Sequence, residues 1–513
     1  MTNHAYYDHL TARLKKSTSA LYRLALVLIL GVLLPVQTYA SSNDSLLIRN
    51  VIIVSADATL SKKPLNVMIK NGRIQAISTA QYSADKVIDG QGQYLIPGLI
   101  DTHVHLSGVP GFTGNEDTKV YQQALAQIPR SYLYAGFTTL LDLANTKQFI
   151  TQWNQQPLAP QAYFCAPAPI PQGYPIATLP EEIQLKVDAA RYYLHDDHHA
   201  HPISQNSHAD PHKPAQLVAA IKEDGALCVK IYYEKGFGKK RNLPVPSKAI
   251  IRELVAAAHQ KKLPVFLHGN SQESYEFALA TDVDMLVHGL WHANANSTPA
   301  DLTQIAKRLA SANIAVQPTV QVLYGEQELF NPDFFQEPYI KQVMPASLIA
   351  WYQSEAGQWM KQEIGEYFGK DSILTDQQKY QQVKAVYQPM LKNIQIVSSQ
   401  LAQQKPLLIF GSDTPSGPIY TQFPGLNGRQ EMQRWIDMGI SLPKLFQAMT
   451  IGNAKKIGLD RNIGSVATNK AADLLLLSKN PLTDITAYDS INWVILKGKP
   501  IARTTLSALH TTQ

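Results

Sequence analysis

The pattern of apolar positions divides the chain into a middle part and two ends of a different character. From residue 46 to 97, short apolar runs are separated by Asn-Gly and Gly turn signals, and no helical period is present. The stretch from 459 to 503 returns to the same short runs. This pattern predicts strands at both ends, and we expect them to assemble into one small composite β-sandwich domain.

The middle of the chain alternates short apolar runs with longer helical patterns, which is the βα rhythm of a parallel sheet. Eight strands are predicted, at 98–103, 138–142, 161–165, 227–232, 265–268, 285–288, 315–318 and 407–411. Eight such units in about 350 residues fit an α/β (β/α)8 TIM barrel with insertions. A doubly wound open sheet is the alternative, although no Gly-x-Gly-x-x-Gly motif opens a predicted helix.

The predicted domain organisation follows from these parts, with a signal peptide at 1–40, the β-sandwich at 41–97 and 459–503, the barrel at 98–458 and a tail at 504–513. Two insertions interrupt the barrel. The insertion at 195–212 holds six of the fifteen histidines. The insertion at 324–401 is polar, Gln-rich and aromatic, and we expect a largely helical lid or flank there.

The first 40 residues have the order of an export signal. Basic residues precede an apolar run at 24–34, Pro35 ends the run, and Thr38 and Ala40 supply the small residues of a cleavage site. The run is shorter than the roughly 20 residues of a membrane span. We therefore expect a protein exported to the periplasm or secreted, without membrane insertion after cleavage. An uncleaved anchor that tethers the protein to the membrane is the alternative.

Composition and charge narrow the function. A chain with 45% hydrophobic and 17% charged residues is typical of a folded globular protein. The net charge is +6, half of it within residues 1–40, which is too dilute for a nucleic-acid-binding surface. The two cysteines, Cys165 and Cys228, form no disulfide framework; buried free thiols are expected, with a single disulfide as the alternative. Homo-oligomer formation is left open.

Two His-x-His pairs differ in their surroundings. His199 and His201 lie in a polar His/Asp/Pro stretch without a strand to orient them, so a solvated loop is expected there. His103 and His105 instead end an apolar strand, where residues i and i+2 face the same side. If that strand belongs to a barrel, both imidazoles point into the mouth where barrel active sites lie. Two neutral imidazoles make half of a site for zinc or a similar ion.

Further polar residues end or follow the later apolar strands. His268, His288 and Asp413 are metal-capable, and Lys230 lies inside an otherwise apolar strand. A single histidine at a strand end is more often structural, and a lysine could point outward with its charge in solvent. Because a lysine inside a barrel is costly unless neutralised or paired, the recurrence of such residues over several strands favours one shared site.

Several motifs resemble those of the amidohydrolase superfamily, within it the imidazolonepropionase-like and prolidase-like branch. They are LIPGLIDTHVH at 95–105, GFTT at 136–139, VKI at 229–231, LH at 267–268, VHG at 287–289, GSD at 411–413, TIGNA at 450–454, GL at 458–459 and ADL at 472–474. The resemblance spans residues 46–503. It implies the barrel with a composite β-sandwich domain that the pattern predicts.

The resemblance also implies a two-metal site. His103, His105 and Asp413 would hold one divalent ion, His268 and His288 a second, and a carboxylated Lys230 would bridge the two, with Zn²⁺ as the expected metal. A metal-bridging hydroxide would attack the substrate carbonyl, with Asp413 as general base and then acid. A mononuclear site with unmodified Lys230 is the alternative.

The expected activity is hydrolysis of a C–N (amide) bond in a small substrate, such as an Xaa-Pro dipeptide or an N-acyl amino acid. A cyclic amide hydrolase, a lactone hydrolase and a deaminase are alternatives, because the same ligands serve each. A non-enzymatic periplasmic metal-binding protein is a further alternative, suggested by the histidine-rich insertion. Four residues after strand ends are candidates to line the substrate pocket or to pack ordinary loops: Tyr233, Gln172, Tyr174 and Thr319.

Overall fold

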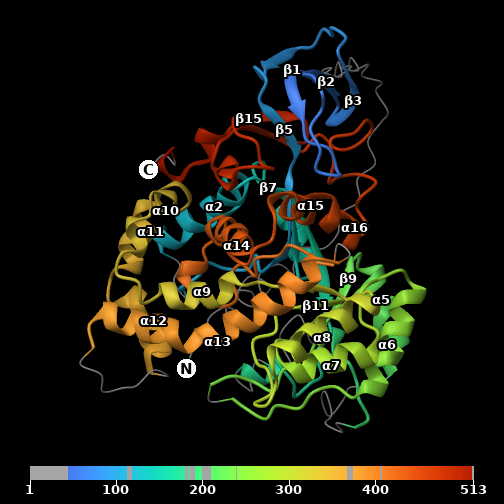
Figure 1. The fold of residues 1–513 in the computed structure, drawn as a ribbon, viewed down its shortest axis with the longest axis vertical. Helices are drawn as coiled ribbons and strands as arrows, with labels where there is room; N and C mark the ends of the chain where they lie inside the picture. The colour runs from blue at the N-terminus through green and yellow to red at the C-terminus, as the bar shows by residue number, and fades with distance from the viewer. Residues whose placement is uncertain are drawn as a thin grey trace, which may run out of the picture.

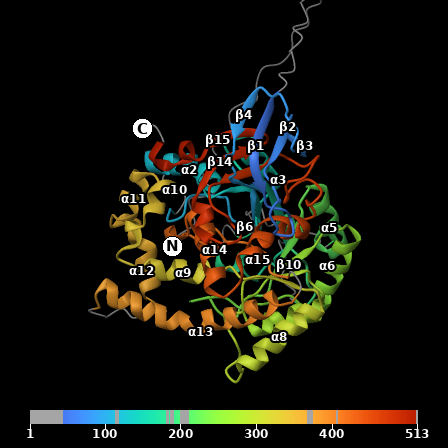
Figure 2. The same cartoon turned by 45° about the horizontal axis from the view of Figure 1, so that its top comes forward.

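The computed structural model describes residues 44–112, 118–179, 184, 191–198, 210–238, 240–366, 374–404 and 407–510. The predicted signal peptide at 1–40 lies outside these residues, as do His199 and His201. A β-rich part lies at one end of the molecule, away from helices α12 and α13 (Figures 1 and 2). Within the described ranges, no helix combines the length and the apolar character that crossing a membrane requires.

A curled sheet of seven parallel strands forms the centre of the molecule. Its strands are β6 (Leu99–Val104), β7 (Phe137–Asp142), β8 (Gln161–Pro167), β9 (Cys228–Tyr232), β10 (Val265–His268), β11 (Met285–Val287) and β12 (Ala315–Gln317). They neighbour one another in chain order, from β6 to β12. A doubly wound sheet reverses its order at a switch point, so this sheet excludes that alternative. The fold is a TIM-barrel-like α/β fold.

The eighth predicted strand, at 407–411, is not a regular strand, and that prediction is wrong in this respect. The segment forms only isolated bridges with Val316 and, further on, with Val104. Its backbone nevertheless reaches both edge strands. The hydrogen bonds run from Val316 N–H to Leu407 O (2.8 Å), from Ile409 N–H to Val316 O (3.0 Å) and from Asp413 N–H to His103 O (2.8 Å).

Asn453 explains why the ladder is interrupted at this segment. It lies in the TIGNA motif and starts the short helix α16 (Asn453–Lys456). Its buried side chain donates to Ile100 O (2.7 Å) and Phe410 O (2.8 Å), and accepts from Phe410 N–H (3.1 Å). At Ile100 and Phe410, the Asn453 side chain therefore bridges β6 and the segment that leads to Asp413.

Helices surround the sheet and bury their apolar stripes against it. They include α2 (Lys119–Tyr134), α3 (Lys147–Asn154), α5 (Pro214–Glu223), α6 (Lys248–Gln260), α7 (Gln272–Thr281), α8 (Pro299–Ser311), α14 (Leu426–Asp437) and α15 (Leu442–Gln447). Helix α6 shows the rule: Ile251, Leu254, Val255 and Ala258 follow a three-and-four spacing and are buried. Ser247 precedes this helix and caps it by accepting from Ile250 N–H.

The insertion after β12 is helical, as its sequence predicts. It contains α9 (Gln321–Glu328), α10 (Pro338–Val343), α11 (Ala346–Tyr352), α12 (Trp359–Gly365) and α13 (Asp376–Ala402). Aromatic side chains of α11 and α12 hold the loop that follows His105. Tyr352 OH donates to Pro110 O (2.5 Å) and Trp359 Nε1–H to Gly111 O (2.6 Å). The insertion thus supports the loop beside the predicted site.

The β-rich part is one eight-stranded sheet drawn from both ends of the chain. Its strands are β1 (Ser45–Ile53), β2 (Leu65–Lys70), β3 (Arg73–Ser78), β4 (Lys86–Asp89), β5 (Tyr94–Pro97), β13 (Leu474–Leu477), β14 (Ile491–Leu496) and β15 (Lys499–Ala502). The antiparallel pairing of β5 with β13 joins the two ends. Buried apolar residues of both ends form a cluster of their own. A two-layered sandwich remains a prediction.

The two cysteines correct one expectation. Both are buried, as predicted, but they form a disulfide rather than free thiols. Cys165 on β8 and Cys228 on β9 are register partners, and their Cα atoms are 4.6 Å apart. Such a separation suits a disulfide. The sequence shows two strands with one cysteine each, but not the register that places them opposite one another.

Candidate metal centre

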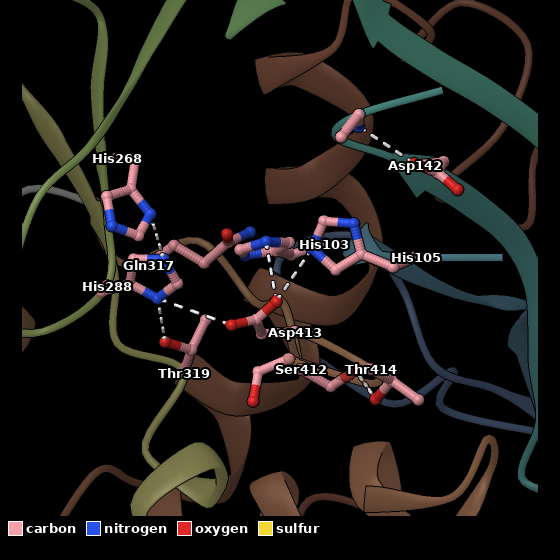
Figure 3. Close-up of polar contacts among 12 residues, drawn as sticks. His103, His105, Asp142, His268, His288, Gln317, Thr319, Ser412, Asp413 and Thr414 are labelled. Carbon is pink, nitrogen blue, oxygen red and sulfur yellow. Dashed lines mark hydrogen bonds and ion pairs between the residues drawn. The ribbon is translucent and has the colours of Figure 1, made fainter. Parts of the chain in front are cut away.

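His103, His105 and Asp413 form the first half of the site. His103 is the last residue but one of the buried strand β6, His105 follows that strand, and both imidazoles turn toward Asp413 (Figure 3). Asp413 Oδ1 lies 3.0 Å from His103 Nε2 and 3.1 Å from His105 Nε2. The His103 side chain is 2% exposed and that of His105 is 34% exposed, so solvent reaches this group on the His105 side.

The electrostatics of this trio suit a divalent cation. Burial lowers the pKa of His103 to about 3, although Asp413 acts in the opposite direction. Burial therefore keeps the His103 imidazole neutral. Burial alone would raise the pKa of Asp413, but His103, His105 and His288 hold it well below its usual range. One ligand atom of each residue lies within 4.8 Å of the others. Two imidazoles and a carboxylate are a donor set typical of zinc sites.

His268 and His288 form the second half of the site. His268 Nδ1 lies 2.9 Å from His288 Nε2. The other ring nitrogen of each histidine, called the outer nitrogen, has an acceptor nearby. His288 Nδ1 is 2.9 Å from Thr319 Oγ1, and His268 Nε2 is 3.6 Å from a carboxylate oxygen of Glu234. If each outer N–H faces its acceptor, the two inner nitrogens present lone pairs to each other. A cation between them removes that repulsion, so the pair fits a metal.

Asp413 lies between the two histidine pairs (Figure 3). Its Oδ2 is 3.7 Å from His288 Nδ1, and the rings of His103 and His288 have centroids 5.3 Å apart. His288, Thr319 and Asp413 all have positive φ, at 90°, 43° and 54°. Non-glycine residues in this region are strained and cluster at functional sites. The backbone is therefore bent to aim these side chains at one another.

Lys230 is buried on β9, with an exposed fraction of 2%, so it does not reach solvent as an outward-pointing lysine would. Burial lowers its pKa to about 7, although Asp413 acts in the opposite direction. Its Nζ lies 6.0 Å from the ring centroid of Tyr232, two residues along on the same side of the strand. A buried amine with this pKa is a nucleophile near neutral pH.

The four predicted pocket residues lie in different places. The ring of Tyr174 stacks on that of His268, with centroids 4.8 Å apart. Thr319 is buried and contacts His288. The half-buried Tyr233 packs on Phe277, with ring centroids 4.7 Å apart, and Gln172 is exposed. The structure thus brings Tyr174 and Thr319 to the histidines but not Gln172 or Tyr233; their substrate-binding roles remain predictions.

Three further residues beside the site were not predicted. Glu234 is 8% exposed and faces His268 from the loop after β9. Tyr232 lies 5.9 Å from His268 between ring centroids, and Trp291 lies 5.6 Å from His288. A signal existed only for Tyr232, since it lies two positions after Lys230 on the same strand.

The histidine-rich insertion does not form a metal centre in its described part. His195 pairs with Asp197 (2.9 Å) and His198 with Asp196 (3.1 Å). Among the described residues, the only group of three or more His, Cys, Asp or Glu ligand atoms that converge is the His103 trio.

Comparison with known sequences points to the amidohydrolase family. The model of the amidohydrolase family matches residues 405–501. A dihydroorotase from Methanosphaera stadtmanae is 37% identical over 92 residues, which cover 17% of this chain and 20% of that protein. One from Lactobacillus helveticus is 29% identical over 193 residues, covering 35% and 42%. The chain therefore matches less than half the length of these curated relatives.

Solved structures match over nearly the full chain. A Xaa-Pro dipeptidase with bound methionine superposes with a TM-score of 0.58 at 17% identity, covering 89% of this chain and 100% of that one. The ochratoxinase of A. niger gives 0.60 at 16% identity, covering 90% and 96%. A putative prolidase from Bifidobacterium longum gives 0.57 at 19% identity, covering 90% and 95%. At these identities the likeness shows a shared fold. The family match, the relatives in sequence and the shared fold together support the amidohydrolase superfamily for this chain.

Proposed function

We propose that the protein is a metal-dependent hydrolase that cleaves a C–N bond of a small amide. The observation that carries this proposal is the position of Asp413 between two pairs of histidines, within 3.7 Å of three of the four imidazoles. So many buried polar groups facing one another favour metal binding or catalysis, because burying such groups is costly.

Two divalent ions, with Zn²⁺ as the expected metal, are the proposed cofactors. His103, His105 and Asp413 would hold one ion, His268 and His288 the other, and Lys230 would contribute a ligand to both as a carbamate formed with carbon dioxide. Carboxylation turns a buried amine into an anion and so reduces the excess positive charge of two divalent ions. When bound, such ions lower the pKa of water from about 16 to about 7 and polarise a carbonyl group.

Asp413 is the proposed proton carrier. Its low pKa keeps it a carboxylate that can accept a proton from the attacking water. The water oxygen forms a bond to the carbonyl carbon, the C–N bond breaks, and Asp413 delivers the proton to the leaving nitrogen. His103 and His105 lie on either side of its Oδ1, with their Nε2 atoms 3.0 and 3.1 Å away. No serine or cysteine nucleophile is needed in such a direct attack by water.

An Xaa-Pro dipeptide or an N-acyl amino acid is the proposed substrate. Solved structures described as an Xaa-Pro dipeptidase and as a prolidase with n-methylphosphonate-l-proline support a dipeptide. The dihydroorotases among the relatives in sequence favour a second candidate, a cyclic amide. A lactone hydrolase and a deaminase stay alternatives, because the same metal ligands and Asp413 serve each reaction.

Assays of the zinc-loaded protein with Xaa-Pro dipeptides, N-acyl amino acids and dihydroorotate separate these candidates. Asp413→Asn should lower the turnover of the accepted substrate by at least about 10²-fold. Full activity of Asp413→Asn would refute the proton role. Tight metal binding without hydrolysis of any substrate would favour the non-enzymatic metal-binding alternative. One ion per chain, with Lys230 unmodified by mass spectrometry, would favour the mononuclear site.

We also propose that the protein is exported to the periplasm or secreted, with its signal peptide at 1–40 removed. The buried Cys165–Cys228 disulfide supports an oxidising compartment. The two chain ends that share one sheet support a composite β-sandwich domain at 41–97 and 459–503. N-terminal sequencing of protein from the cell envelope tests the cleavage, and retention of the first 40 residues would favour the membrane-tethered alternative.

A further inference from the structure

Thr319 adopts a backbone conformation that its surroundings must enforce. It follows β12, is fully buried, and has a φ of 43°. A β-branched residue in this region is a conformational outlier, and such strain persists only where the neighbouring structure determines it. The conformation places Thr319 Oγ1 2.9 Å from His288 Nδ1 (Figure 3). The strained residue thus contacts a proposed metal ligand.

Glu431 on α14 holds the backbone next to Thr319. It is fully buried, and its Oε2 accepts the N–H of Gln321 at 2.6 Å. Its Oε1 accepts Trp435 Nε1–H at 2.9 Å. The side chain of Gln321 adds two bonds to the same helix, donating to Gln430 Oε1 (2.9 Å) and accepting from Arg434 Nε (3.0 Å). The turn after Thr319 is therefore fixed to α14 through main chain and side chain.

We propose that Glu431 is a positioning residue for the second half of the metal site: by fixing the turn at Thr319, it keeps the Thr319 hydroxyl where it accepts the Nδ1–H of His288. This inference rests on the proposed function in assigning His288 as a metal ligand. With its proton on Nδ1, His288 presents the lone pair of Nε2 to the side on which His268 Nδ1 lies, 2.9 Å away. Partners of this kind orient ligand imidazoles and fix their tautomer.

The contacts of Glu431 indicate which substitution tests its role. Both oxygens of Glu431 accept from N–H donors. Glu431→Gln replaces one of these oxygens with an NH₂ group, which cannot accept, while the side-chain volume stays nearly the same. Burial raises the pKa of Glu431 to about 7, so comparisons are made well above that pH, where the carboxylate is charged. Thr319→Val removes the hydroxyl at constant shape, and Thr319→Ser retains it.

A matched control lies on α9 itself. Glu326 is a half-buried carboxylate, and it accepts from Tyr387 OH of α13 rather than from the turn at Thr319. Glu326→Gln therefore changes a carboxylate on α9, the helix that begins at Gln321, without changing the contacts that lead to His288. It should leave both readouts below at their wild-type values.

The first readout is the tautomer of His288 in the metal-free full-length protein, by ¹⁵N NMR of labelled histidine, assigned with His288→Asn. Wild type and Thr319→Ser should carry the proton on Nδ1, whereas Thr319→Val and Glu431→Gln should shift it toward Nε2. An unchanged tautomer in Thr319→Val or Glu431→Gln would overturn the proposal. If Glu431→Gln does not fold, Glu431→Asp, which keeps the charge but shortens the side chain, takes its place.

The second readout is the affinity of the more weakly held Zn²⁺, by competition with a chelator. It should fall about 10–100-fold in Thr319→Val and in Glu431→Gln, while the tighter ion is unaffected. The double variant should lose no more than Thr319→Val alone, because both changes act through one hydroxyl. Additive losses would overturn the proposal. Absence of a second ion in wild type would instead refute the two-metal function, while the tautomer readout would still decide the role of Glu431.

Discussion

Truncation of Asn453 tests how the ring of strands is completed. Asn453 forms three buried hydrogen bonds, at 2.7, 2.8 and 3.1 Å, to Ile100 and Phe410. These bonds join β6, which carries His103, to the segment that carries Asp413. Asn453→Ala should therefore lower the stability of the barrel and weaken the link between the strand of His103 and the segment of Asp413.

The expected loss follows from the contacts. A buried hydrogen bond contributes about 1 kcal/mol net, and a buried group left without a partner costs about 1–3 kcal/mol. Phe410 O keeps a second donor, Thr102 Oγ1, at 2.8 Å, which limits the loss at that atom. Three bonds with one such compensation give a decrease of about 3–5 kcal/mol in the free energy of unfolding.

Equilibrium urea unfolding, followed by tryptophan fluorescence, measures this decrease. Asn492→Ala is the matched control, since the exposed Asn492 side chain also donates two hydrogen bonds, to Gln93 Oε1 (3.0 Å) and Ser478 Oγ (2.8 Å). At an exposed site the change should stay within about 0.5 kcal/mol. Equal losses in the two variants would refute the role given to Asn453.

Two further predictions concern the site. Glu234→Gln should lower the affinity for the ion held by His268 about 10–100-fold in chelator competition, because the Glu234 carboxylate faces His268 Nε2. Glu273→Gln, at an exposed carboxylate, should leave that affinity unchanged, and equal effects of the two variants would contradict the role given to Glu234. Metal-free protein should gain stability as pH rises above about 7, by about 1.4 kcal/mol per unit, because Lys230 is deprotonated near 7 when folded but near 10.5 when unfolded. Lys230→Met should lack this rise in urea unfolding at several pH values, and a rise that persists would assign it to other groups.

Periodicity and strand ends predicted most of the sheet. Seven of the eight predicted strands are present, because buried parallel strands are short apolar runs that contrast with the helices between them. His103, His105, His268, His288 and Asp413 converge because the carboxyl ends of neighbouring parallel strands meet at one face. The helical insertion and the sheet shared by both chain ends also follow from local patterns.

What the sequence did not predict depends on register and on contacts between distant residues. The disulfide requires Cys165 to lie opposite Cys228, and strand register is not visible in either run alone. The segment before Asp413 is apolar like a strand, yet Asn453, 43 residues away from Phe410, replaces its ladder. Glu234 and Glu431 lie in a loop and on a helix, where a carboxylate is usually solvated, and only the fold buries them beside the site.

We propose that two metal ions bind in one chain, held by the two histidine pairs, Asp413 and Lys230. The most direct test is metal content per chain of the purified protein by inductively coupled plasma mass spectrometry, for wild type and Lys230→Ala. We expect close to two zinc-like ions in wild type and one or none in Lys230→Ala. A folded wild-type protein that holds no ion with His103 and His105 intact would contradict it.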